Sequence, residues 1–152
     1  MIICGFPGVG KTTAAKERDD VIDVESSDYH YDPTDHLISL SWPRNYINKL
    51  ADLNRTYPDK YILASCHKEV RKELDKRGVD YIIVVPDIFI RWWYKLLYIK
   101  RKNSASFINN VMRNWDKWIW EIDHQHKHAV VHLGVGEFMT DLLNGSLYNK
   151  YL

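Results

Sequence analysis

The stretch GFPGVGKTT, residues 5–13, carries the clearest chemistry in the sequence, because it matches the pattern G-x-x-x-x-G-K-[ST]. Its glycines allow the backbone to curl, so that successive N–H groups point at phosphate oxygens. A helix that begins here adds its partial positive charge, Lys11 reaches the β- and γ-phosphates, and the Thr12 hydroxyl ligates Mg²⁺. We therefore expect seven residues to bind a nucleoside triphosphate: Gly5, Gly8, Val9, Gly10, Lys11, Thr12 and Thr13. Of these, Thr12 is the expected metal ligand.

Two acidic residues that could act beside this loop follow the second apolar stretch of the chain. Residues 21–28 read VIDVESSD, which places Asp23 and Glu25 two positions apart. In phosphoryl transfer a protein mainly positions groups and neutralises charge, so an acid near the attacking oxygen is useful without being a strong base. We expect Asp23 or Glu25 to accept a hydrogen bond from the acceptor or to orient a water on Mg²⁺. The alternative interpretation is a solvated acidic turn after an edge strand.

The stretches that must position these residues alternate between short apolar runs and helical patterns, which is typical of a parallel sheet covered by helices. Strands are expected at 1–4, 21–25, 61–65, 81–85 and 129–133. Helices are expected at 11–18, 45–53, 68–77, 88–102, from Ser104 or Ser106 to about 123, and at 137–143. The apolar face of the helix that ends near 123 is expected to be Phe107, Val111, Trp115, Ile119 and Ile122.

The predicted fold class is α/β: a three-layer P-loop NTPase fold with a five-stranded parallel sheet in the order 2-3-1-4-5. It forms a single domain over residues 1–152, with an acceptor-side segment at 26–53 and a helical lid region at 88–123. The tail, 144–152, is expected to pack loosely.

Two classes of phosphate-loop protein are disfavoured by what the sequence lacks. GTPases read their base with an N-K-x-D segment, and none is present. Motor and AAA-type ATPases use a strand that ends hhhhD[DE], whereas the strands expected at 61–65 and 81–85 run into Ser-Cys-His and Val-Pro-Asp.

Four segments carry a resemblance to a known group: Glu-Ser-Ser at 25–27, WPRNYI at 42–47, SCHKEVR at 65–71 and NWDKWI at 114–119. The chain resembles the small P-loop kinases of the nucleoside-monophosphate kinase, shikimate kinase and gluconate kinase group. It is close to phage-encoded adenylate-kinase-like members over nearly its whole length. In that group a D-x-D-like pair follows the second strand, and here Glu25 replaces the second Asp. The resemblance implies an ATP-dependent kinase of nucleotide metabolism that uses ATP and Mg²⁺, with a nucleoside or deoxynucleoside monophosphate as the favoured acceptor.

The same resemblance gives roles to three arginines. Arg71 would hold the acceptor phosphate, for which the planar guanidinium fork is well suited. Arg101 and Arg113, ahead of Lys100 and Lys102, would be lid residues that close over the γ-phosphate and expel water. Each of these side chains could instead be an exposed residue on a helix.

Several ring-bearing residues allow two interpretations. Tyr29, His30, Tyr31 and Trp42 could stack on a nucleobase, or they could form a small hydrophobic cluster under a long loop. His67 could touch the acceptor or cap the helix that follows it. The donor adenine is expected, from the resembling kinases, at GVGEF, residues 134–138.

The composition is that of an ordinary globular domain, with 45% hydrophobic and 27% charged residues. The 21 Lys and Arg against 20 Asp and Glu argue against a protein that coats nucleic acid. No apolar run is long enough to span a bilayer, no secretory signal pattern opens the chain, and Cys4 and Cys66 are expected to be reduced thiols. We therefore expect a cytoplasmic enzyme, in a host cytoplasm if phage-encoded, with a small-molecule phosphate acceptor and no membrane partner.

Other functions stay open at this point. The acceptor could be a nucleoside, a sugar, or a hydroxyl of a nucleic acid, although long strands need a basic track. The chain could also be a non-catalytic module in which ATP orders the lid and a partner reads the closed shape. The Trp and Tyr residues of 92–120 would then form an interface. The sequence leaves the oligomeric state undetermined.

Overall fold

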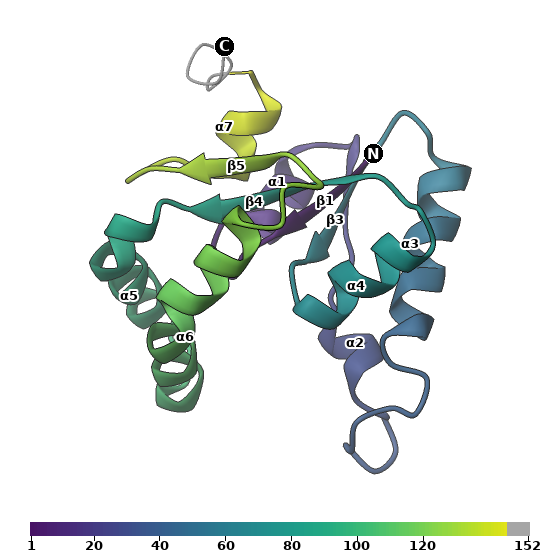
Figure 1. The fold of residues 1–152 in the computed structure, drawn as a ribbon, viewed down its shortest axis with the longest axis horizontal. Coiled ribbons are helices and arrows are strands. Elements are labelled where there is room, and N and C mark those ends of the chain that lie inside the picture. The colour runs from purple at the N-terminus through teal and green to yellow at the C-terminus, as the bar shows by residue number, and fades with distance from the viewer. Residues whose placement is uncertain (146–152) are drawn as a thin grey trace. The chain divides into compact units, whose positions relative to one another are not determined.

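The computed structural model describes residues 1–145 (Figure 1). Its five strands form one parallel sheet in the order β2-β3-β1-β4-β5, which confirms the predicted α/β class and strand order. Their bounds are β1 Ile2–Gly5, β2 Val21–Asp23, β3 Tyr61–Ser65, β4 Tyr81–Pro86 and β5 Val130–Leu133. The predicted loose tail, 144–152, lies from residue 146 onward outside the described residues.

The helices follow the predicted pattern with three corrections. Their bounds are α1 Lys11–Glu17, α2 Ser27–His30, α3 Arg44–Thr56, α4 Lys68–Lys76, α5 Arg91–Lys100, α6 Ala105–Asp123 and α7 Met139–Leu143. The single helix predicted at 88–102 is wrong: a 3₁₀ turn at Ile88–Ile90 precedes α5, and the Asp87 carboxylate accepts a hydrogen bond from the Phe89 N–H at 2.9 Å. α2 lies in a segment expected to be irregular, and α7 begins two residues later than expected.

The chain divides into two compact units. The first comprises Met1–Gly5 and Lys11–Ile82, and the second comprises Phe6–Gly10 and the chain from Ile83 onward. Residues 5–13, the predicted phosphate loop, therefore begin and end in the first unit, while residues 6–10 belong to the second.

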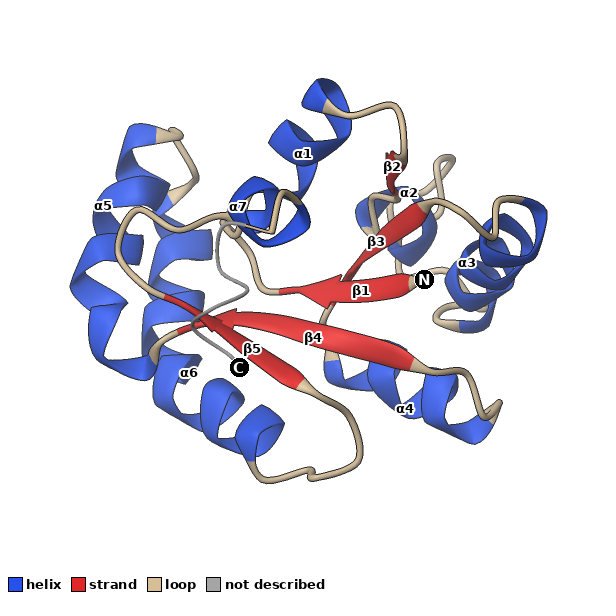
Figure 2. Ribbon diagram, turned by 90° about the horizontal axis from the view of Figure 1, so that it is seen from above, coloured by secondary structure: helices blue, strands red, loops and turns tan. Residues whose placement is uncertain are grey.

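In the first unit, β2, β3 and β1 run parallel (Figure 2). The side chains of β1 and β3 are mostly apolar and buried, as expected for strands that are covered on both faces, whereas β2 ends in the partly exposed Asp23. The helix α3 buries Tyr46, Ile47 and Leu50, and α4 buries Val70 and Leu74, four residues apart on one face. Gly78 follows α4 with a φ of 67°, the left-handed conformation in which glycine commonly ends a helix.

In the second unit, β4 pairs with β5, and α5 and α6 lie side by side (Figure 1). α6 begins where the Ser104 hydroxyl accepts a hydrogen bond from the Phe107 N–H at 3.1 Å. Its buried face is Ile108, Val111, Trp115, Ile119 and Ile122. The prediction of Phe107 in this face is wrong by one position, since that ring is half-buried and packs edge-on to Tyr98. None of the helices in the described part of the chain has the length and hydropathy needed to cross a membrane.

Candidate active site

The phosphate loop is curled at two glycines. Gly8 and Gly10 have φ values of 89° and 94°, in a region that residues with a side chain rarely adopt. Between them, buried Val9 donates its N–H to the Phe6 carbonyl at 3.3 Å, and its own carbonyl accepts from the Met139 N–H at 2.7 Å. These hydrogen bonds hold the bend in the second unit.

Helix α5 packs against this bend through its tyrosine face. The Tyr98 hydroxyl donates to the Pro7 carbonyl at 2.7 Å. A Cβ atom at Gly8 would lie 2.9 Å from Cε1 of Tyr98 and 3.4 Å from Nη1 of Arg101. Gly8 is therefore required for close approach as well as for its backbone conformation, and the guanidinium of Arg101 lies beside the loop.

The two predicted lid arginines differ in their surroundings. Arg101 lies at the C-terminal cap of α5, beside Gly8. Arg113 is exposed on α6, and no hydrogen bond or ion pair joins it to a described residue. Contacts within the second unit thus bring Arg101, but not Arg113, to the loop.

In the first unit, the start of α1 meets the end of β2. The Lys11 ammonium donates to the Gly5 carbonyl at 3.0 Å. The Thr12 hydroxyl donates to Oδ2 of Asp23 at 3.1 Å, and Thr13 is exposed. The predicted metal ligand and one of the two predicted acids are therefore in direct contact.

Asp23 and Glu25 act as a pair of carboxylates. The Val24 N–H donates to the Leu63 carbonyl at 3.0 Å, so the chain stays extended past β2, and residues two apart on an extended chain face the same side. The pKa of Glu25 is raised, mainly by partial burial and next by the negative charge of Asp23, while the positive charge of Lys11 acts to lower it. Oδ1 of Asp23 is buried and has no hydrogen-bond partner among the described residues.

This set of oxygen atoms fits Mg²⁺. Magnesium takes oxygen ligands and is commonly held by one or two carboxylates together with waters and substrate phosphates. The unpartnered Oδ1 of Asp23 is an acceptor that a cation would satisfy. Residues 1–145 contain no group of three or more His, Cys, Asp or Glu side chains able to hold a metal, so a magnesium site here would need nucleotide phosphates to complete it.

The predicted acceptor arginine belongs to the same unit. Arg71 is half-buried on α4, and its Nε donates to the Cys66 carbonyl at 2.9 Å, just past β3. Its positive charge and that of Lys11 both act to lower the pKa of Cys66, which burial raises overall. Cys66 and the buried Cys4 are both free thiols. The charge of Lys11 thus acts on both Cys66 and Glu25, whereas that of Arg71 acts on Cys66.

Of the two roles predicted for His67, the capping of the following helix is wrong. His67 occupies the N-cap position of α4, but its side chain makes no capping hydrogen bond. Instead, its Nδ1 lies 2.9 Å from the Ser65 hydroxyl. The pKa of His67 is lowered, chiefly by desolvation. The charge of Glu69 opposes this shift, while His30, Lys11 and Arg71 add to it.

The sequence pattern did not identify Tyr46 as part of the site. Its buried hydroxyl donates to the Val24 carbonyl at 2.6 Å and accepts from the Ser65 N–H at 3.1 Å. These two bonds join the ends of β2 and β3 next to the candidate site residues. The helical spacing identified Tyr46 only as a member of an apolar face.

The aromatic residues of the acceptor-side segment stack on one another. The His30 ring is stacked between two aromatic rings. Its centroid lies 4.5 Å from that of Trp42, with an interplanar angle of 12°, and 4.6 Å from that of Tyr31, with an interplanar angle of 14°. Trp42 also stacks on Tyr46. The space between Trp42 and Tyr31 is thus filled by an imidazole of the same chain, as the hydrophobic-cluster interpretation expects, and base stacking stays a prediction.

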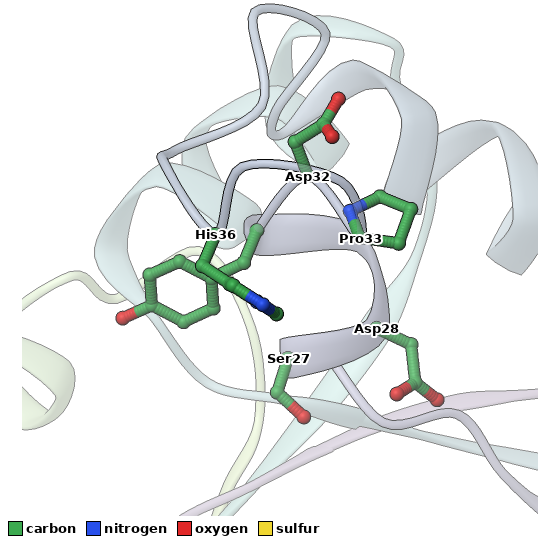
Figure 3. A pocket seen from close by; sticks show the side chains of 6 residues that line it. Ser27, Asp28, Asp32, Pro33 and His36 are labelled. Atoms are coloured by element: carbon green, nitrogen blue, oxygen red, sulfur yellow. The ribbon is translucent and has the colours of Figure 1, made fainter.

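The same segment forms a hollow of about 520 Å³ (Figure 3). Figure 3 shows the His36 ring directed toward Ser27 across it. The lining residues include no lysine, no arginine and none of the predicted phosphate-binding residues: Ser27, Asp28, Tyr31, Asp32, Pro33 and His36. The hollow therefore lacks the lysine or arginine that a phosphate site needs, and it does not coincide with the predicted phosphate-binding residues.

The residues expected to hold the donor adenine lie near the end of the phosphate loop. A Cβ atom at Gly10 would lie 3.3 Å from Cβ of Phe138. The Glu137 carboxylate accepts a hydrogen bond from the Gly134 N–H, which folds residues 134–138 into a tight turn. This places the turn beside Gly10 within the second unit.

No model of a known protein family matches the sequence, and no curated protein matches it either.

Proposed function

We propose that this chain is an ATP-dependent kinase that transfers a phosphoryl group to a small acceptor, with a nucleoside or deoxynucleoside monophosphate as the favoured one. The observation that carries the proposal is the contact between Thr12 and Asp23 at the end of a curled glycine loop. A curled loop alone binds phosphate. A loop whose threonine contacts a carboxylate, with a second carboxylate and an arginine nearby, is also equipped for phosphate transfer.

The loop and the start of α1 would hold the triphosphate of ATP. Backbone N–H groups between Gly5 and Thr13, apart from those of Phe6 and Val9, which are bonded within the chain, would face its oxygens. Lys11 would exchange the Gly5 carbonyl for the β- and γ-phosphates. Thr12 and Asp23 would hold Mg²⁺, which neutralises charge on the β- and γ-phosphates when it is bound. The acceptor oxygen bonds to the γ-phosphorus as the bond to the β–γ bridging oxygen breaks, and ADP leaves.

The acceptor would be held by Arg71 and Glu25. A monophosphate acceptor presents an oxygen that is already anionic, so the reaction needs little proton removal and depends on positioning. Arg71 grips the acceptor phosphate with the part of its guanidinium that the Cys66 carbonyl leaves unused. Glu25 accepts a hydrogen bond from the acceptor, and Arg101, with Arg113 on lid closure, stabilises the charge that develops on the transferred group.

The proposal is tested by replacing Lys11 and a matched lysine of the same helix. Lys16 is exposed in the last turn of α1, and no described residue bonds to it. ADP release is measured with a panel of nucleoside monophosphates, deoxynucleoside monophosphates, nucleosides and oligonucleotides. Lys11→Ala should lower acceptor-dependent turnover by roughly a hundredfold or more, while Lys16→Ala should leave it unchanged.

Two outcomes would contradict the proposal. Full activity of Lys11→Ala would remove the assigned role of the loop. Tight ATP binding by the wild-type chain, with no acceptor in the panel that gives turnover, would favour the non-catalytic module.

A further inference from the structure

One face of α5 is apolar and exposed. Trp92, Leu96 and Ile99 are 58%, 54% and 54% exposed, and Phe89, just before the helix, is 85% exposed. The opposite face of the same helix carries Tyr94 and Tyr98, which are buried. Single exposed apolar residues are ordinary, but a row of four large ones is characteristic of a surface that binds something.

The four exposed residues have the spacing of a helix-packing seam. Their separations are three, four and three residues, as for positions a, d, a and d of a heptad. Tyr98 donates to the Pro7 carbonyl, so the buried face of α5 lies on the phosphate loop. The seam lies on the other side of α5, so these side chains are not available to the phosphate site and need a different explanation.

The surroundings of the seam are strongly basic. Residues 88–113 contain six Lys and Arg and no Asp or Glu, which leaves 15 Lys and Arg against 20 acids in the rest of the chain. Lys95 and Lys100 occupy the heptad positions that flank the seam, g and e. Both are exposed, and no carboxylate in residues 1–145 pairs with either.

We propose that this face of α5 docks an amphipathic helix of a partner protein, with apolar side chains along its seam and Glu or Asp at its flanking positions. Opposite charges at the flanking positions set partner choice between packed helices. A second copy of this chain is disfavoured, because it would bring Lys95 and Lys100 against lysines. A nucleic acid strand is disfavoured, because the aliphatic side chains of Leu96 and Ile99 do not stack with bases.

The test uses the full chain and a synthetic three-heptad peptide with Leu at a and d and Glu at e and g. Binding is followed by the fluorescence anisotropy of the labelled peptide. The wild-type chain should bind it, and the double variant Lys95→Glu/Lys100→Glu should bind it about tenfold or more weakly. The same variant should gain binding to a peptide with Lys at e and g, a rescue that a misfolded variant cannot give.

The matched control is Lys49→Glu/Lys72→Glu, which changes two exposed lysines on α3 and α4 and should leave peptide binding unchanged. Circular dichroism shows whether each variant keeps its helices. Equal binding of a peptide with a scrambled seam, or no binding of the acidic peptide, would overturn the proposal. It would also fail if Trp92→Ala abolished self-association of the chain, or if vesicles rich in phosphatidylglycerol bound the face and the peptide did not.

Discussion

Replacing Gly8 by alanine should destabilise the protein more than the same change at Gly78. Both glycines have positive φ, 89° and 67°, so each substitution carries a backbone strain of about 1–2 kcal/mol. At Gly78 nothing lies within 4 Å of the new Cβ, whereas at Gly8 it would meet Cε1 of Tyr98 at 2.9 Å. Tyr98 is fully buried and bonded to the Pro7 carbonyl, so its ring cannot easily move. Overpacking of this kind adds about 1–3 kcal/mol.

The difference between the two variants should therefore be about 2 kcal/mol, or roughly 4–8 °C in melting temperature for a chain of this size. It is measured by thermal and urea unfolding followed by circular dichroism. The substitution of Tyr98 by leucine removes the closest of the three atoms that the new Cβ would meet, the others being Cε1 of Tyr94 at 3.3 Å and Nη1 of Arg101 at 3.4 Å. Gly8→Ala should therefore cost less in a Tyr98→Leu background than in the wild-type chain. Equal losses at Gly8 and Gly78, or an unchanged cost in the Tyr98→Leu background, would refute the packing of α5 on the loop.

Three further predictions concern the first unit. Asp23→Asn should lower the pKa of Glu25, followed by NMR titration, because a neighbouring negative charge is removed. A raised carboxyl pKa means that the folded protein binds that proton more tightly than the unfolded chain does. Stability therefore falls as pH rises from the ordinary pKa of a glutamate through the raised one, and this slope should flatten in Asp23→Asn. Tyr46→Phe should cost about 1–3 kcal/mol in urea unfolding, because it leaves the buried Val24 carbonyl and Ser65 N–H without their partner. Arg71→Ala should raise the KM of the acceptor far more than the KM of ATP, and equal increases would show that Arg71 does not bind the acceptor.

The strands were predictable because buried parallel strands are nearly continuous apolar runs. Their order was predicted from the P-loop fold that the glycine motif indicates, and not from the apolar runs. Residues 61–65 form a strand with the bounds that the pattern gave. The region after β4 was harder, because residues 88–102 have one continuous helical pattern. The sequence alone does not show that the Asp87 side chain caps a separate 3₁₀ turn before α5.

The candidate site could be proposed from the sequence where its residues are close together in the chain. Gly8, Gly10, Lys11 and Thr12 lie in one motif, so their types and spacing define it. Tyr46 and Tyr98 were not predictable, because their hydroxyls bond to main-chain carbonyls 22 and 91 positions away. Buried tyrosine hydroxyls usually have a hydrogen-bond partner, although that of Tyr94 on α5 has none among the described residues. Only the fold identifies the partners of Tyr46 and Tyr98.

The contact of Thr12 also separates the roles of two acids that the sequence left equivalent. Thr12 is the predicted metal ligand, and its hydroxyl donates to Asp23 and not to Glu25. Under the proposed function, Asp23 therefore lies at the metal side of the site, where its unpartnered Oδ1 has a cation to satisfy it. The side chain of Glu25 is more exposed to solvent than that of Asp23, but partial desolvation and the neighbouring charge of Asp23 still raise its pKa, so its charged form is disfavoured. Bound Mg²⁺ would relieve part of that cost by offsetting the charge of Asp23, so ATP·Mg²⁺ would prepare Glu25 to accept the hydrogen bond of the incoming acceptor.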